Sequence, residues 1–145
     1  MKRIARSALV PFSADKMFHL VNDISRYPDF LPGCSSSRIL ESTPDRVIAS
    51  MEISRIGISR TFTTNNKLIP GKAILMSLVE GPFRFLNGGW YFTPLDNYAC
   101  KTELKLSFDF SNQMIEIVFG KIFKELTDSM VGAFTRRAEQ IYAEK

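Results

Sequence analysis

Residues with reactive side chains are scarce in this chain. Its 145 residues include a single histidine, His19, and two cysteines, Cys34 and Cys100. One histidine alone cannot build a catalytic triad or a metal site, and the cysteines are too far apart to match a zinc or redox motif. The HExxH, GxSxG and glycine-rich phosphate-binding motifs are absent as well. We therefore expect a binding protein rather than an enzyme, with no catalytic residue, no metal and no required cofactor.

Long apolar runs and runs of like charge are missing too. No segment reaches the roughly 18 apolar residues of a membrane span, and no apolar signal core follows the basic residues 1–7. The sequence therefore predicts a cytoplasmic protein in which both cysteines are free thiols. The net charge of +4 is mild and its basic residues are scattered. This charge permits contact with RNA or a membrane surface, but we expect no DNA partner.

Aromatic residues are abundant by contrast, and phenylalanine leads them with 12 copies. Hydrophobic residues make up 45% of the chain, which is enough for a full core. A chain of this length fits one domain, so we expect a single domain over residues 1–145. Large, rigid apolar side chains in this number either fill the core or line a cavity.

The pattern of apolar and turn residues predicts an α+β fold. Alternating stretches predict strands at 2–10, 36–43, 46–56, 58–68, 73–80, 86–94 and 98–110. Short gaps with turn residues join most of them, so sequential strands should be antiparallel neighbours. A helix is expected from Ser13 to about Asn22, followed by a short helical turn and a loop within 23–33.

Residues 113–143 predict one long amphipathic helix with a broad apolar face. Such a helix is long enough to cross a whole sheet. Gly120 and Gly132 each cost about 1 kcal/mol inside a helix, so we expect a kink or a close approach at these positions. The elements together predict a curved antiparallel sheet packed around a long C-terminal helix.

The aromatic side chains come from consecutive strands, from the loop at 23–33 and from the long helix. In a flat two-layer domain they would simply form the core. In a strongly curved sheet one helix cannot fill the concavity, and aromatic walls would surround an apolar cavity with a few polar groups. The apolar residues that we take as candidates for ligand contact are Tyr27, Phe30, Leu31, Phe62, Phe83, Trp90, Phe92, Phe108, Phe110, Leu126, Met130 and Phe134.

Three charged residues are further candidates. Along the predicted strands, Glu80 falls on the same face as Ile74, Met76 and Leu78, because it lies at an alternate position. Arg60 falls on the same face as Phe62 for the same reason. If both point inward they form a buried ion pair, because a lone buried carboxylate is costly. The alternative is that strand ends or bulges turn both to solvent. Arg137 projects onto the apolar side of the long helix, where it either extends to the rim or sits at a cavity mouth.

Three ordered blocks carry a resemblance to a known family. The segment from Asp23 to Pro32 resembles the D-[IV]-x-x-Y-P-x-F-[LV]-P signature of START-like coenzyme Q-binding and polyketide cyclase-like proteins. The segment from Leu78 to Trp90 resembles the second signature of that family, L-x-x-G-P-F-x-x-L-x-x-x-W. Leu104 to Phe110 resembles its last strand, so the similarity covers essentially the whole chain.

This resemblance implies a helix-grip fold with an apolar cavity, at which Tyr27, Phe30, Phe83 and Trp90 would line or close the pocket. The mitochondrial relatives are implied to bind ubiquinone and to support respiration. Stretches at 20–23, 30–34, 57–64 and 123–126 resemble a bacterial branch of toxins. That branch is implied to bind the large ribosomal subunit and to block its joining with the small one. The resemblance supplies no catalytic residue.

Three hypotheses follow for the function. The first is a toxin-like protein that binds the large ribosomal subunit, with a small antitoxin-like partner left open. The second is a carrier or chaperone for ubiquinone or another isoprenoid or hydrophobic lipid. The third, an aromatase or cyclase, is the least favoured, because few acidic or basic residues are placed to face inward. The first two are compatible, since an occupied cavity could control ribosome binding.

Overall fold

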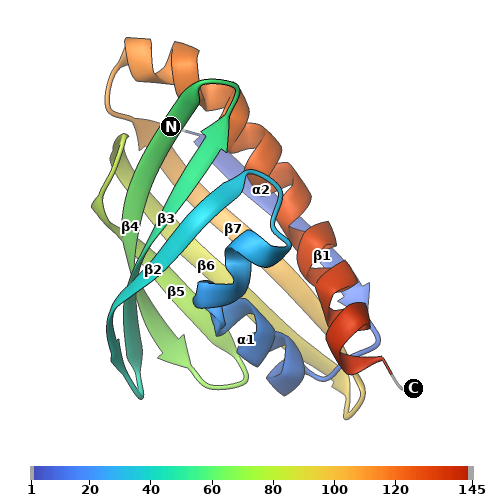
Figure 1. Ribbon diagram of the computed structural model, residues 1–145. Coiled ribbons are helices and arrows are strands. Elements are labelled where there is room, and N and C mark those ends of the chain that lie inside the picture. Colours follow the sequence, from blue (N-terminus) through green and yellow to red (C-terminus); the bar gives the residue numbers. More distant parts are fainter. Residues whose placement is uncertain (1, 144–145) are drawn as a thin grey trace.

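The computed structural model describes residues 2–143 as ten successive elements (Figure 1). The first three are strand β1 (Lys2–Val10), helix α1 (Ala14–Asn22) and the 3₁₀ helix η1 (Ile24–Asp29). Six strands follow: β2 (Cys34–Thr43), β3 (Arg46–Arg55), β4 (Ile58–Ile69), β5 (Ala73–Glu80), β6 (Phe83–Asp96) and β7 (Ala99–Phe110). Helix α2 (Gln113–Tyr142) ends the described chain.

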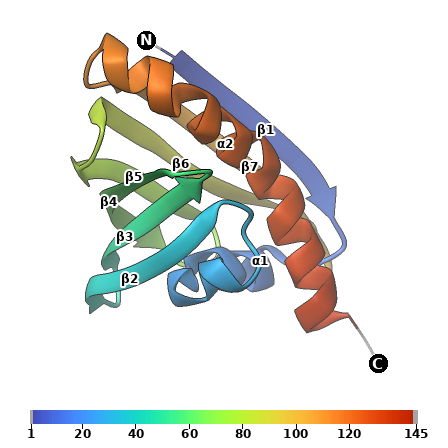
Figure 2. The ribbon, with the colours of Figure 1, turned by 45° about the horizontal axis from the view of Figure 1, so that its top comes forward.

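Within residues 2–143 the seven strands form one antiparallel sheet in the order β1-β7-β6-β5-β4-β3-β2. Each strand from β2 to β7 pairs with its neighbour in sequence, and β1 joins beside β7. The sheet curves strongly, and α2 lies along its concave side (Figures 1 and 2). The prediction of an α+β helix-grip fold is confirmed.

Helix α2 supplies much of the core. Asn112 caps it, because its side-chain oxygen accepts a hydrogen bond from the Ile115 N–H at 2.9 Å. Three of its phenylalanines, Phe119, Phe123 and Phe134, are at most 2% exposed against the sheet. No helix among residues 2–143 is both long enough and apolar enough to cross a membrane.

The two short helices close one end of the concavity. Ser13 caps α1 as predicted, since its hydroxyl accepts the Lys16 N–H at 3.1 Å. Tyr27 in η1 donates a hydrogen bond to the Val21 carbonyl in α1, and its ring contacts Phe134 of α2 with centroids 5.2 Å apart. One side chain therefore joins both short helices to the long one.

Strand β6 is longer than the sequence predicts. The turn residues around Pro82 and Pro94 suggested a strand at 86–94, but it runs from Phe83 to Asp96. Register shifts between Phe83 and Phe85, and between Pro94 and Asp96, place a bulge near each end. A bulge lets the ladder continue past a proline that cannot donate a hydrogen bond.

Two glycines allow β6 to pass close to both neighbouring strands. A Cβ atom at Gly88, whose φ is 145°, would lie 2.0 Å from the Lys105 carbonyl oxygen of β7. A Cβ atom at Gly89 would lie 2.6 Å from the Ile74 carbonyl oxygen of β5. The strands therefore approach at a distance that only glycine permits.

The glycines of α2 have no such role. The nearest atom to a Cβ at Gly120 would be in the Phe110 ring at 3.6 Å, which is an ordinary contact. At Gly132 it would be a terminal guanidinium nitrogen of Arg136 at 3.4 Å. The close approach, one of the two alternatives expected at these positions, is therefore not found, and a kink there stays a prediction.

Candidate functional site

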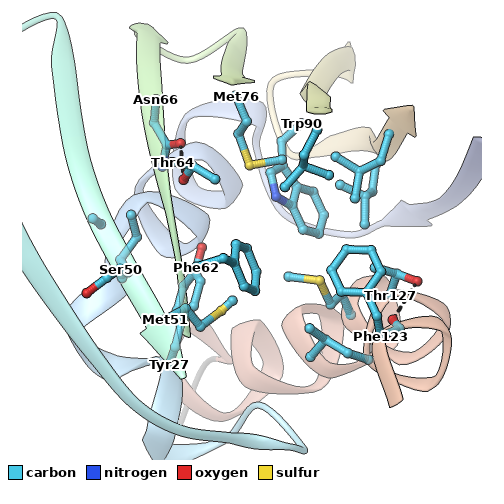
Figure 3. Close-up of a pocket in the computed structure, with 17 residues that line it drawn as sticks. Tyr27, Ser50, Met51, Phe62, Thr64, Asn66, Met76, Trp90, Phe123 and Thr127 are labelled. Carbon is cyan, nitrogen blue, oxygen red and sulfur yellow. Dashed lines mark hydrogen bonds between the residues drawn. The ribbon is translucent and has the colours of Figure 1, made fainter. Parts of the chain in front are cut away.

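A cavity of about 60 Å³ lies between the concave face of the sheet and α2 (Figure 3). Most of the 17 residues that line it are apolar. These are Ile24, Ala49, Met51, Phe62, Met76, Leu86, Trp90, Leu104, Leu106, Phe123, Leu126 and Met130. The volume is well below the roughly 300–1,000 Å³ of a typical small-molecule pocket. A ligand larger than a few atoms would therefore have to displace lining side chains.

Three methionines make such displacement easy. Met51 from β3, Met76 from β5 and Met130 from α2 all line the cavity, and Figure 3 draws no hydrogen bond to Met51 or Met76. Methionine is unbranched and adapts its shape at low cost. The cavity wall is therefore more deformable than one built from branched or aromatic side chains alone.

Several elements contribute polar groups to the cavity lining. On β4, the Thr64 hydroxyl donates to the Asn66 side-chain oxygen at 2.8 Å, and both residues are buried. The ring of Trp90 faces the cavity, and Figure 3 draws no hydrogen bond to its indole nitrogen. Thr127 is bonded to the Phe123 carbonyl on the helix side at 3.1 Å. Thr64, Asn66 and Trp90 can therefore form hydrogen bonds with a neutral ligand.

Among residues 2–143, none of those that line the cavity is charged. Tyr27, the most acidic of them in solution, is kept neutral because burial raises its pKa far above the ordinary value. Cys34 lies nearby, and its thiol is neutral too, because burial raises its pKa to about 11. The lining can bind a neutral, mostly apolar molecule, but it holds no group poised for acid–base or nucleophilic catalysis at neutral pH.

The predicted apolar candidates divide into two groups. Five of them line the cavity: Tyr27, Phe62, Trp90, Leu126 and Met130. The other seven lie in or against the surrounding core, with Leu31, Phe83, Phe92, Phe108, Phe110 and Phe134 buried and Phe30 half-buried. Phe83, for example, lies 4.9 Å from Phe123 and 5.4 Å from Phe110 between ring centroids. That any of these residues contacts a ligand stays a prediction.

Glu80 and Arg60 do not form the buried ion pair that was one alternative. A register shift between Thr63 and Thr64 in the β4–β5 pairing places Glu80 on the face opposite to Leu78, although alternation predicts the same face. Glu80 is therefore exposed. Arg60 is half-buried near the start of β4, and its guanidinium donates to the Ser59 carbonyl at 3.0 Å. The bulge is therefore the reason that simple alternation fails at this end of β5.

Arg137 lies outside the cavity lining. Its guanidinium carbon sits 5.1 Å from the centroid of the Phe30 ring, and a terminal nitrogen reaches Gln140 at 3.5 Å. This cation–π contact covers the Phe30–Phe134 ring pair on its outer side. Arg137 is half-buried, and whether its side chain extends to the rim or sits at a cavity mouth stays a prediction.

Twelve of the 17 lining residues were not among the predicted candidates, and Met51, Thr64, Asn66 and Met76 are four of these twelve. A usable signal existed in β4, where Phe62, Thr64, Asn66 and Leu68 occupy alternate positions. Two polar residues in the buried register of a strand indicate either a polar cavity wall or a hydrogen-bonded pair. The structure shows both.

Comparisons with known proteins agree with this fold. Residues 10–135 match the family model described as polyketide cyclase / dehydrase and lipid transport. The chain is 63% identical over 144 residues to the "Ribosome association toxin RatA" of Vibrio cholerae, covering 99% of this chain and 100% of that protein. It is 26% identical to the "Coenzyme Q-binding protein COQ10 homolog B, mitochondrial" of Xenopus laevis, covering 97% of this chain and 60% of that protein.

Among solved structures, the Zhui aromatase/cyclase from Streptomyces sp. R1128 superposes with a TM-score of 0.86. The superposition covers 98% of this chain and 96% of that chain. Because the two sequences are only 17% identical, the likeness establishes the shared fold alone.

Proposed function

The chain belongs to the polyketide cyclase / dehydrase and lipid transport family, and within it to the ribosome association toxin RatA proteins. We propose from this membership that it binds the large ribosomal subunit and blocks its joining with the small one. The observation that carries the proposal is 63% identity across 99% of the chain to the Vibrio cholerae protein of that name.

Two properties of the molecule support a binding role over a catalytic one. The cavity lining lacks charged side chains, so the acid and base that a cyclase reaction requires are missing from it. The net charge of +4 favours approach to the phosphate-rich surface of a ribosomal subunit. Blocking subunit joining then requires only that the bound protein occupies space that the small subunit needs.

A subunit-joining assay on sucrose gradients tests this proposal directly. Purified protein mixed with isolated subunits is expected to sediment with the large subunit and to deplete joined ribosomes. At about tenfold above its Kd it should occupy about 90% of the large subunits, so joining should fall in proportion. If phosphate contacts dominate, raising the salt concentration should release the protein.

The matched control is the same protein mixed with the small subunit alone, where it should remain at the top of the gradient. Normal joining, with the protein at the top in every mixture, would rule out ribosome binding. Co-sedimentation that does not change with salt would retain binding but would point to ribosomal proteins as the contact.

A second function, as a carrier of ubiquinone or a similar isoprenoid lipid, is favoured by a different observation. The cavity combines apolar walls with the neutral hydrogen-bonding groups of Thr64, Asn66 and Trp90. A quinone head group, with neutral carbonyl acceptors on an apolar ring, has matching chemistry. The similarity to a coenzyme Q-binding protein, over 97% of this chain and 60% of that protein, adds to this support.

The sole tryptophan of the chain provides the readout for this second function. Because Trp90 lines the cavity, a bound quinone should quench its fluorescence in a saturable titration. Ala49→Leu replaces a buried methyl group in the lining with an isobutyl group, and should weaken the affinity about tenfold or more. Ile48→Leu, on the neighbouring residue outside the lining, is the control and should leave the titration unchanged.

Solvent extraction of the purified protein complements the titration. A stoichiometric lipid in the extract would support the carrier function. No extracted lipid together with no quenching by quinone would exclude it, without bearing on the ribosome assay.

A further inference from the structure

Strand β2 forms one edge of the sheet, and this edge is unusually open. It pairs with β3 on one side, and no strand among residues 2–143 pairs with its other side (Figure 2). The 3₁₀ helix η1 packs near its start, where the Ser37 hydroxyl donates to the Ile24 carbonyl at 2.8 Å. Beyond that point every residue from Arg38 to Thr43 is exposed. Backbone groups on such an edge are available to pair with another strand.

A bulge in β2 changes which side chains share a face. Ile39 lies opposite Ala49 of β3 and Glu41 lies opposite Ile48, so Leu40 is an extra residue between them. Arg38 lies opposite Ser50, two positions from Ile48 on the partner strand. Arg38 and Glu41 therefore point to the same face of the sheet. Without the bulge, residues three apart would point to opposite faces.

The sequence of this segment is self-complementary. Residues 37–42 read Ser-Arg-Ile-Leu-Glu-Ser. When two copies pair antiparallel about a twofold axis between the third and fourth residues, each Arg38 lies opposite a Glu41. The serines at the two ends also lie opposite each other, and the isoleucine faces the leucine. Because the bulge places both charged residues on one face, the opposed side chains can meet.

The charged groups are available for such contacts. Within residues 2–143 no carboxylate forms an ion pair with Arg38, whereas Glu41 uses Oε1 to bind Arg46 at 2.8 Å. No hydrogen bond from the described part of the chain reaches the other carboxylate oxygen of Glu41, so it can accept one from a second copy. Ile39 and Leu40 between them are 39% and 49% exposed and would be covered by the same pairing.

We propose that the β2 edge is a self-association site, at which a second copy of this chain pairs antiparallel through residues 37–42 to form one continuous sheet. Charge complementarity favours this occupant, because a second copy of the segment presents Glu41 and Arg38 at the two matching positions by symmetry. The interface is isologous, so each residue contact occurs twice. Its small size predicts a dimer that forms and dissociates with protein concentration.

Charge reversal gives a test in which the variants serve as each other's control. Arg38→Glu places two glutamates opposite each other, and Glu41→Arg places two arginines opposite each other. Each variant alone should dimerise about tenfold or more weakly than the wild type in sedimentation equilibrium. A mixture of the two variants should form a heterodimer of near wild-type affinity, because both charge pairs are then of opposite sign. The chain that carries both changes should recover the homodimer.

Arg46→Ala controls for the ion pair within one copy, since Glu41→Arg also removes that bond. It should dimerise like the wild type, and thermal unfolding should show every variant folded. A wild type that remains monomeric to the solubility limit overturns the proposal. It is equally overturned if the single variants dimerise normally, or if their mixture fails to recover. None of these measurements uses ribosomes, so they are independent of the proposed function.

Discussion

Replacing Gly88 by alanine is expected to lower the free energy of unfolding by about 3 kcal/mol or more. The new methyl carbon would lie 2.0 Å from the Lys105 carbonyl oxygen and 2.9 Å from the Leu106 Cα atom. Both atoms belong to the backbone of β7, which is paired to β6 along almost its whole length, so neither can withdraw without loss of ladder hydrogen bonds. The φ of 145° at Gly88 adds a backbone conformation that alanine rarely adopts.

The matched control is the same substitution at Gly132. There the nearest atom, at 3.4 Å, is the free end of the Arg136 side chain, which can move aside. Gly132→Ala should therefore raise the free energy of unfolding by about 1 kcal/mol, because alanine has a higher helix propensity than glycine. Urea denaturation followed by circular dichroism measures both variants, and the two changes should have opposite signs. A Gly88→Ala protein within about 0.5 kcal/mol of the wild type would show that the two strands can separate at little cost.

Phe134→Ala should lower the free energy of unfolding by a similar or greater amount, about 3–5 kcal/mol. The Phe134 side chain is 0% exposed, and its ring centroid lies 5.2 Å from Tyr27, 5.2 Å from Phe30 and 5.1 Å from Trp90. These rings come from η1, from the residue that follows it and from β6, so Phe134 joins α2 to two other parts of the fold. The substitution removes the shared partner of three edge-to-face contacts as well as a buried side chain.

Ile117→Ala on the same helix is the control, because Ile117 is 72% exposed and its loss should change the unfolding free energy by less than about 0.5 kcal/mol. The emission of Trp90 provides a second observable for Phe134→Ala, since the indole loses a ring neighbour. If Phe134→Ala lowered the free energy of unfolding by less than about 1 kcal/mol, the aromatic cluster would contribute little to holding η1 against α2.

The order of the strands and helices could be predicted because it depends on local signals. Alternation in β7, the Ser13 cap and the turn residues between strands each act within a few positions. The bulges could not be predicted in the same way. Whether an extra residue is accommodated near Leu40 or Val79 depends on the register with the neighbouring strand, which is a long-range property.

The composition of the cavity wall was only partly predictable for a related reason. Alternation along each strand identifies which residues face the helix, but the curvature of the sheet decides which of these residues line the cavity. Phe62 and Phe83 are both buried, with ring centroids 5.7 Å apart, yet only Phe62 lines the cavity. The polar pair of Thr64 and Asn66 was detectable from strand parity, whereas the lining role of Met51 and Met76 depends on the spacing between sheet and helix.

The burial of both cysteines has a practical consequence for testing the proposed ribosome binding. Cys34 and Cys100 are 6% and 0% exposed, and burial raises the pKa of each thiol, to about 11 for Cys34. The reactive thiolate is therefore rare at neutral pH, and alkylating reagents reach neither sulfur easily. A cysteine introduced on the surface would be the only fast-reacting thiol in the otherwise native chain. Site-directed crosslinking to ribosomal subunits can thus proceed residue by residue without removing either native cysteine.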